Sequence, residues 1–196
     1  MYDYIKGSLV ELTPTELVLD CNDIGFKILI SLQTYSKLKQ GEIVKLYIHH
    51  HTREDLEQFF GFFDKDERFI FRNLIEVSGI GPNSARMMLS SLTSDEVREA
   101  IITGDINKLK SVKGVGLKTA QRLLIDLKDK IAKGSSSDTF SSIYTSVNTG
   151  HKEEATSALI LLGFTKANVE KVLDSLLREN PAYTLEELIK LSFKRL

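Results

Sequence analysis

The stretches "SGIGPNSARMMLSSL" (residues 78–92) and "KGVGLKTAQRLLIDL" (residues 113–127) repeat one phrase, Gly-hydrophobic-Gly followed by an apolar helical pattern. In each stretch we expect a helix to end, the chain to turn through the glycines and a second helix to begin, because glycine permits positive φ and close backbone approach. The residue between the glycines, Ile80 or Val115, is apolar and is expected to anchor the turn in a core. The repeat therefore predicts two hairpins of one kind within an all-helical region.

The start of the second helix in each repeat is a candidate phosphate site. Its free N–H groups point outward together and add to the positive end of the helix dipole. Lys118 and Arg122 lie one turn apart in the second copy, so both can flank one phosphate, a contact that positions DNA without reading bases. The first copy has Asn83 where the second has Lys118, and Arg86 is the candidate to compensate from the next turn. The predicted phosphate-binding residues are Gly79, Gly81, Asn83, Ser84, Arg86, Gly114, Gly116, Lys118, Thr119 and Arg122.

Both stretches resemble helix-hairpin-helix DNA-binding motifs, and two in tandem imply a pair that holds both strands of a duplex across the minor groove. A nucleotide P-loop is the competing phosphate site, since "GVGLKT" ends in Lys-Thr. That pattern needs glycine at the positions of Val112 and Leu117, so the spacing excludes it. We expect the chain not to hydrolyse ATP itself.

The first 63 residues contain short apolar bursts separated by turn residues. Five short strands with little helical periodicity favour an OB-type β-barrel. Tyr4, Phe26 and Tyr47 lie among the alternating apolar positions and are expected to fill this barrel. The five bursts are "YIKGSLVEL", "LVLDC", "GFKILIS", "EIVKLYIHH" and "LEQFFGF".

Together with this barrel, the helical remainder of the chain predicts an α+β multidomain protein. Residues 64–133 have helical periodicity, and Thr93 with Glu96 has the spacing of a capping box. Residues 134–150, rich in Ser, Thr and Gly, predict a flexible linker. Residues 151–196 predict a bundle of three short amphipathic helices, the last capped by Thr184 and Glu187. A small bundle on a long tether is typical of an interaction module.

The charge pattern favours nucleic acid more than the net charge of −1 indicates. Between Lys108 and Lys133 eight basic residues face only Asp126 and Asp129. The chain has no run of 18 apolar residues, and its start lacks the features of a signal peptide, so we expect a cytoplasmic protein without a membrane span.

Cysteine and histidine indicate no further chemistry. The single cysteine, Cys21, excludes an internal disulfide and is expected to be a small buried side chain. If residues 49–51 form a strand, only His49 and His51 share a face, and no other His or Cys lies nearby in the sequence, so no metal site is expected.

The order of barrel, tandem hairpins, Ser-rich linker and small bundle resembles the RuvA family, the junction-recognition subunits of bacterial Holliday junction branch-migration complexes. The stretch "TREDLEQFFGF" is similar to that family's acidic turn before a strand ending in aromatic-Gly-Phe. The resemblance implies a tetramer that holds a four-way junction open and planar, with Glu54 and Asp55 of each subunit as an acidic pin at the crossover. It leaves open whether one tetramer or two face-to-face tetramers, an octamer, clasp the junction.

The resemblance also implies partners. The C-terminal bundle would dock onto RuvB, a hexameric ATPase, through Leu159, Leu162 and Phe164, and the RuvC resolvase would act on the same junction. The chain itself would have no catalytic site, metal or cofactor, since ATP is used by the partner.

The residues alone leave plainer alternatives open. Charged residues at a hairpin tip, such as Glu54 and Asp55, are usually exposed to solvent without any further role. Leu159 and Leu162 are explained at least equally well by packing within the three-helix bundle. A helix-hairpin-helix enzyme such as a base-excision glycosylase could use Asp126, and a single-strand binder could stack bases on the barrel aromatics.

Overall fold

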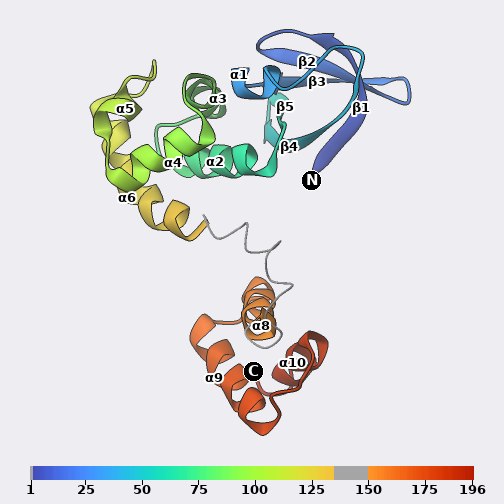
Figure 1. Ribbon diagram of the computed structural model, residues 1–196, viewed down its shortest axis with the longest axis vertical. Helices are drawn as coiled ribbons and strands as arrows, with labels where there is room; N and C mark the ends of the chain where they lie inside the picture. The colour runs from blue at the N-terminus through green and yellow to red at the C-terminus, as the bar shows by residue number, and fades with distance from the viewer. Residues whose placement is uncertain (1, 135–149) are drawn as a thin grey trace. The chain divides into compact units, whose positions relative to one another are not determined.

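The computed structural model describes residues 2–134 and 150–196 (Figure 1). The chain divides into two compact units, Met1–Ser135 and Ser136–Leu196. The predicted linker at 134–150 falls almost wholly on residues 135–149, outside the described part of the chain. The predicted domain limits stay predictions.

The first unit begins with a closed five-stranded barrel, which confirms the OB-type prediction. The strand order is β1-β2-β3-β5-β4, with β3 and β5 parallel and the other neighbours antiparallel. Side chains alternate across the pleat, so that Ile5, Leu46 and Ile48 fill the interior. The strands are β1 (Tyr4–Leu12), β2 (Glu16–Cys21), β3 (Ile24–Ile30), β4 (Ile43–Arg53) and β5 (Leu56–Phe62).

The prediction that the barrel aromatics fill its interior is wrong for Tyr4 and Tyr47. The two tyrosines are cross-strand partners of β1 and β4, on the face opposite to the inward Ile5 and Leu46. Tyr4 is 52 % exposed, and the Lys45 Nζ atom lies 4.0 Å from its ring centroid. Phe26 is half-buried, as is Cys21, whose thiol donates to the Lys6 carbonyl oxygen at 3.2 Å.

Six helices complete the first unit, and one of them, α1, was not anticipated. They are α1 (Leu32–Tyr35), α2 (Lys65–Glu76), α3 (Pro82–Ser91), α4 (Ser94–Thr103), α5 (Ile106–Lys110) and α6 (Leu117–Gly134). Asp64 caps α2 by accepting from the Glu67 amide at 2.7 Å, and the predicted capping box of Thr93 and Glu96 opens α4. Local side-chain acceptors therefore fix where these helices start.

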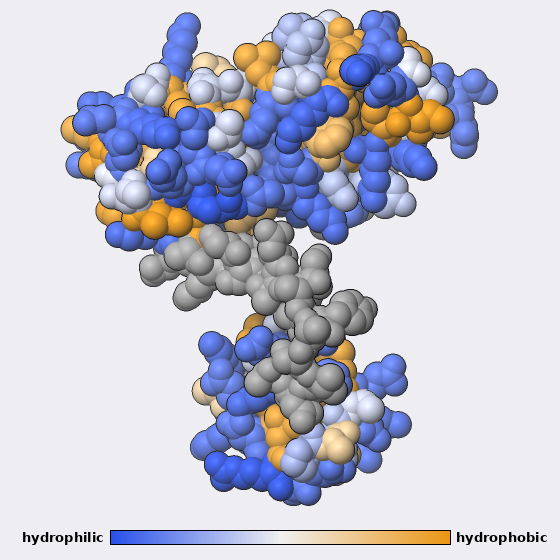
Figure 2. Space-filling model, viewed as in Figure 1, coloured by the Kyte–Doolittle hydropathy of each residue, from blue (hydrophilic) through white to orange (hydrophobic). Residues whose placement is uncertain are grey.

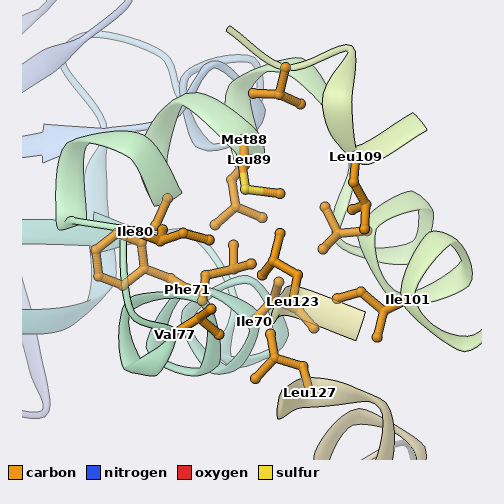
Figure 3. Close-up of a cluster of buried hydrophobic side chains, with 14 of the residues drawn as sticks. Ile70, Phe71, Val77, Ile80, Met88, Leu89, Ile101, Leu109, Leu123 and Leu127 are labelled. Carbon is orange, nitrogen blue, oxygen red and sulfur yellow. The ribbon is translucent and has the colours of Figure 1, made fainter. Parts of the chain in front are cut away.

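One core joins the helices to the barrel. Buried side chains of α2 to α6 converge around Phe71, Met88 and Leu123 (Figure 3). Phe60 and Phe62 of β5 belong to the same cluster, and their rings lie 5.2 Å and 4.8 Å from that of Phe71. The barrel and the hairpin region are consequently packed as one body.

In the described part of the second unit, residues 150–196, three helices surround a small core of their own, as the sequence predicts. They are α8 (Gly150–Leu161), α9 (Lys166–Glu179) and α10 (Leu185–Ser192). The core includes Leu159, Val169, Leu173 and Leu188, and the predicted capping box of Thr184 opens α10. Within the described residues, no helix is both long and apolar enough to span a membrane.

Candidate nucleic-acid interface

The two glycine hairpins have matching backbones. Gly79 has φ +95° and Gly114 has φ +92°, a left-handed conformation that glycine adopts without steric cost. The following residues, Ile80 and Val115, are 5 % and 6 % exposed, which confirms that they anchor the turns. In both hairpins the amide of the anchor residue donates to the carbonyl three residues earlier, at 3.0 Å and 3.1 Å. The sequence repeat is thus a repeat of conformation.

The second glycine of each hairpin stands at the start of the next helix. Ala85 donates to the Gly81 carbonyl at 3.0 Å and Ala120 donates to that of Gly116 at 2.9 Å, the first helical hydrogen bonds of α3 and α6. The N–H groups before Ala85 and Ala120 therefore have no carbonyl of their own helix to pair with, although Pro82, the first residue of α3, contributes no N–H. A Cβ atom at Gly81 or Gly116 would meet nothing within 4 Å. Each helix start is thus open to an anion.

The hairpins lie against each other. A Cβ atom on Gly79 would come within 3.9 Å of the Thr119 Oγ1 atom, in the first turn of α6. Arg122, one turn further along α6, places its Nη1 atom 3.4 Å from both the carbonyl and the hydroxyl oxygen of Ser78. The start of the second copy's helix thus adjoins the turn of the first copy.

Positive charge concentrates at the second hairpin. Lys108 lies 3.6 Å from carboxylate oxygens of Glu96 and Glu99, and Lys130 is paired elsewhere in the helical region. Lys113 and Lys118 are exposed, and neither belongs to any ion pair among the described residues. Sequence reasoning missed Lys113, although it occupies the repeat position of Ser78. Both free lysines flank the open start of α6.

The first hairpin has no matching charge. Asn83 is exposed at the position equivalent to Lys118, and Ser84 is half-buried beside it. Arg86 donates from Nη1 to the Thr15 carbonyl at 2.7 Å, so its guanidinium is docked against the barrel. Compensation for Asn83 by Arg86 stays a prediction, and this contact ties α3 to the turn between β1 and β2.

Glu54 and Asp55 form the two-residue tip that joins β4 to β5. Arg53 and Leu56 are the last pair of the ladder, and both acidic side chains are exposed. The tip extends beyond the barrel strands and has no ion pair among the described residues. The acidic turn is therefore available to approach a ligand.

His49 and His51 share one face of β4, as predicted, with ring centroids 6.3 Å apart. His49 also packs against Phe71 at 5.3 Å. Burial, helped by the nearby Arg72 guanidinium, lowers the pKa of His49 to about 4. Within residues 2–134 and 150–196, no group of three or more His, Cys, Asp or Glu side chains could hold a metal ion. Asp126, considered above for base excision, is exposed on α6.

The C-terminal bundle requires one correction. Leu159 is fully buried in the bundle core and cannot serve as a partner contact. Leu162 is 58 % exposed, and Phe164 is half-buried with its ring 5.6 Å from that of Phe193. Leu161, missed from the sequence, is 88 % exposed. The visible face of this unit is mostly hydrophilic with a small apolar patch (Figure 2).

A closed barrel followed by paired glycine hairpins with open helix starts defines a tandem helix-hairpin-helix protein with an OB-type domain. Comparison with known proteins agrees. The chain matches the family models RuvA N terminal domain over residues 1–61, SAM-like Helix-hairpin-helix tandem over 71–129, and RuvA, C-terminal domain over 150–196. The chain belongs to the RuvA family.

Relatives match over their full length. The chain is 46 % identical over 196 residues to a protein of Christiangramia forsetii, 46 % over 201 residues to one of Bacteroides fragilis and 47 % over 203 residues to one of Bacteroides thetaiotaomicron. Each alignment covers 100 % of both chains, and each relative is named Holliday junction branch migration complex subunit RuvA.

Proposed function

We propose that this chain binds four-way (Holliday) DNA junctions and holds them open for branch migration in recombination and repair. The observation that carries the proposal is the pair of adjacent hairpins with matching backbones, each presenting an open helix start. Two such sites side by side suit the two phosphate backbones of one duplex arm, gripped without base readout. The names of the full-length relatives support the same function.

The residues in contact with phosphate are the ten predicted ones, with Lys113 added. Lys118 and Arg122 give the second hairpin its salt-sensitive affinity, whereas the first hairpin acts mainly through its backbone amides. Charged contacts of this kind position the duplex and contribute no sequence preference.

Glu54 and Asp55 act as a pin that repels phosphates at the crossover. Like unit charges 4 Å apart repel by about 1 kcal/mol in water and by about 4 kcal/mol at an effective dielectric of 20. Continuous duplex lying across the tip would suffer this repulsion, while an open junction places its strands around it. The tip therefore acts in discrimination and takes no part in strand cleavage.

The chain acts as a non-catalytic subunit in the cytoplasm. We propose a homotetramer with fourfold symmetry, or two tetramers face to face as an octamer, since four equivalent clamps suit four arms. The C-terminal unit recruits the RuvB ATPase through Leu162 and Phe164, RuvC resolves the junction, and ATP is consumed by RuvB. No cofactor or metal is required of this chain.

One comparison tests the function. The full chain is titrated with a four-way junction, a linear duplex and a single strand at one stated salt concentration, while products are analysed on a gel. We expect the junction to bind most tightly and all strands to stay intact. Equal affinity for the three ligands would refute junction recognition. Preference for the single strand would favour base stacking on the outward Tyr4 and Tyr47, and base release would favour a glycosylase.

A further inference from the structure

Helix α2 connects the barrel strand that follows the acidic tip to the first glycine hairpin. We propose that Glu67 on this helix is a positioning residue that sets where the tip lies relative to that hairpin. Through this placement, Glu67 would determine the preference for junctions over duplex. The inference rests on the proposed function, in which Glu54 and Asp55 repel phosphates. The helix begins at Lys65, directly after the barrel, and ends at Glu76, directly before the first hairpin. It therefore connects the two functional elements.

Glu67 is fully buried and ties α2 to α1 and β5. The hydroxyls of Ser31 and Thr34 both donate to its carboxylate, that of Thr34 at 2.7 Å. The Thr34 Oγ1 atom also accepts from the amide of Phe63, the residue after β5, at 3.0 Å. Burial raises the pKa of Glu67, and the two hydroxyl donors oppose that rise. Because hydrogen bonds are directional, this network fixes the angle between helix and strand as well as their contact.

Two arginines that follow Glu67 on α2 hold β4, the other strand of the acidic hairpin. Arg68 donates from Nη1 to the carboxylate and the carbonyl of Asp3, both at 2.7 Å. Arg68 and Arg72 each reach the Ile48 carbonyl at 3.3 Å. Ile48 lies on β4, about 20 Å along the strand from the acidic tip at 3.3 Å per residue.

Both strands of the acidic hairpin are thus gripped near their base by one helix. The helix has 12 residues, so it is about 18 Å long, and it leads directly into Val77 of the first hairpin. A small rotation of α2 on the barrel would move the clamp relative to the tip. Loosening the Glu67 network should consequently leave the clamp intact and misplace the tip.

The test uses two variants of the full chain. Thr34→Val keeps the side-chain shape but removes the hydroxyl that links Glu67 to Phe63. Glu67→Gln keeps the shape, and its amide can still bond both hydroxyls. We expect junction affinity to stay within about twofold for both, while Thr34→Val strengthens duplex binding and so lowers the junction-to-duplex affinity ratio by about 3- to 10-fold, and Glu67→Gln lowers it less. Circular dichroism selects a temperature at which every variant is folded.

Two controls separate positioning from general loss of stability. Thr93→Val makes the same chemical change at the cap of α4, where the hydroxyl bonds only to Glu96 among the described residues, and should keep the native ratio. In a background with Glu54→Gln and Asp55→Asn, Thr34→Val should cause no further loss of preference, because the element it positions is already neutral. Such non-additivity indicates coupling between the sites.

The outcomes are distinguishable. A native protein without junction preference would refute the proposed function, and the inference with it. A native preference that survives Thr34→Val and Glu67→Gln would overturn the inference alone. A loss of preference that is equal in Thr93→Val, or that adds fully to the neutral tip, would also overturn it.

Discussion

The Arg122 Nη1 atom lies 3.4 Å from the Ser78 carbonyl oxygen, so a side chain from the second hairpin's helix reaches the backbone of the first. The contact joins two stretches that are separate in sequence and similar in conformation. The hairpins therefore form one continuous surface, and changes in either should alter binding to the same duplex arm.

The charge difference between the hairpins predicts opposite effects of two substitutions. Lys118→Ala should reduce the slope of log affinity against log salt by about one, with no change in sequence preference. Asn83→Lys places a charge at the equivalent position of the first hairpin and should raise that slope by about one. Duplex titrations between 50 and 200 mM salt measure both. An unchanged slope in Lys118→Ala would remove that residue from the phosphate contacts.

The paired glycines separate folding from binding. Gly79→Ala forces alanine to φ +95° and should lower the free energy of unfolding by roughly 1–2 kcal/mol. Gly81 has φ −86°, which alanine adopts readily, and a methyl group there would meet open space. For Gly81→Ala, the free energy of unfolding should therefore be unchanged or raised by up to about 1 kcal/mol. The methyl group would narrow the open space at this helix start, where we propose that a phosphate binds, so DNA affinity should fall. Urea unfolding and duplex titration compare the two, and full binding by Gly81→Ala would argue against phosphate at this helix start.

Neutralising the acidic tip should reduce the selectivity for junctions over duplex without weakening the binding of junctions. The double substitution Glu54→Gln and Asp55→Asn removes the repulsion of phosphates while both side chains keep their shape. We expect junction binding to persist and binding of linear duplex to strengthen. Competition between the two DNAs at fixed salt measures the change. If a folded double variant lost all DNA binding, a role in repulsion would be ruled out.

Two leucines of the C-terminal unit should behave differently. Leu159→Ala creates a cavity in the bundle core and should cost about 2–5 kcal/mol of that unit's stability. Leu162→Ser alters an exposed side chain and should leave stability within about 0.5 kcal/mol. If this exposed surface binds RuvB, Leu162→Ser should weaken co-purification of the two proteins. It should also weaken the stimulation of the RuvB ATPase by this protein bound to junctions. Unchanged RuvB binding would exclude Leu162 from the interface.

His49 predicts acid sensitivity of the first unit. Its pKa is about 4 in the folded chain and about 6.5 when unfolded, so the unfolded state binds more protons between these values. Stability should be complete above pH 6.5 and fall as the pH approaches 4. Burial is the main cause, and Arg72, Arg68, His50 and His51 all disfavour a further positive charge there. Since the ring is only partly buried, the loss should be about 1–2 kcal/mol after allowance for solvent screening.

The variant His49→Phe isolates this effect. The raised pKa of Glu67 acts in the opposite direction, because its folded form takes up a proton more readily as the pH falls. That contribution is common to both proteins and cancels in their difference. Urea unfolding at pH 7.5 and pH 5 should therefore show a greater loss in the native chain than in His49→Phe. Equal losses would contradict the shifted pKa.

The sequence predicts what depends on local signals. The turns at Gly79 and Gly114, the capping boxes and the alternating strands each follow from residues a few positions apart. The docking of Arg86 on Thr15 could not be predicted in this way, because it joins residues far apart in sequence. Helix α1 has only four residues and makes its main hydrogen bonds to a distant glutamate, so it leaves no periodic pattern.

The other errors concern which face of a strand or helix a side chain lies on. Tyr4 and Tyr47 alternate with apolar neighbours, and strand periodicity alone does not say which face is inside. Leu159 and Leu162 are three positions apart on a helical pattern, but α8 ends at Leu161, so only the first points into the core. The position at which a helix ends thus decides which of its periodic apolar residues are buried.

The shared core of Phe60 and Phe62 with the helices bears on how such chains can be recombined. A chimaera that takes its barrel from one relative and its hairpins from another would bring together two halves of a core shaped in different proteins. The second unit has a core of its own, so an exchange between the two units leaves both cores whole. A chimaera that exchanges only the C-terminal bundle should therefore keep its native stability, whereas one that separates the barrel from the hairpins should lose stability.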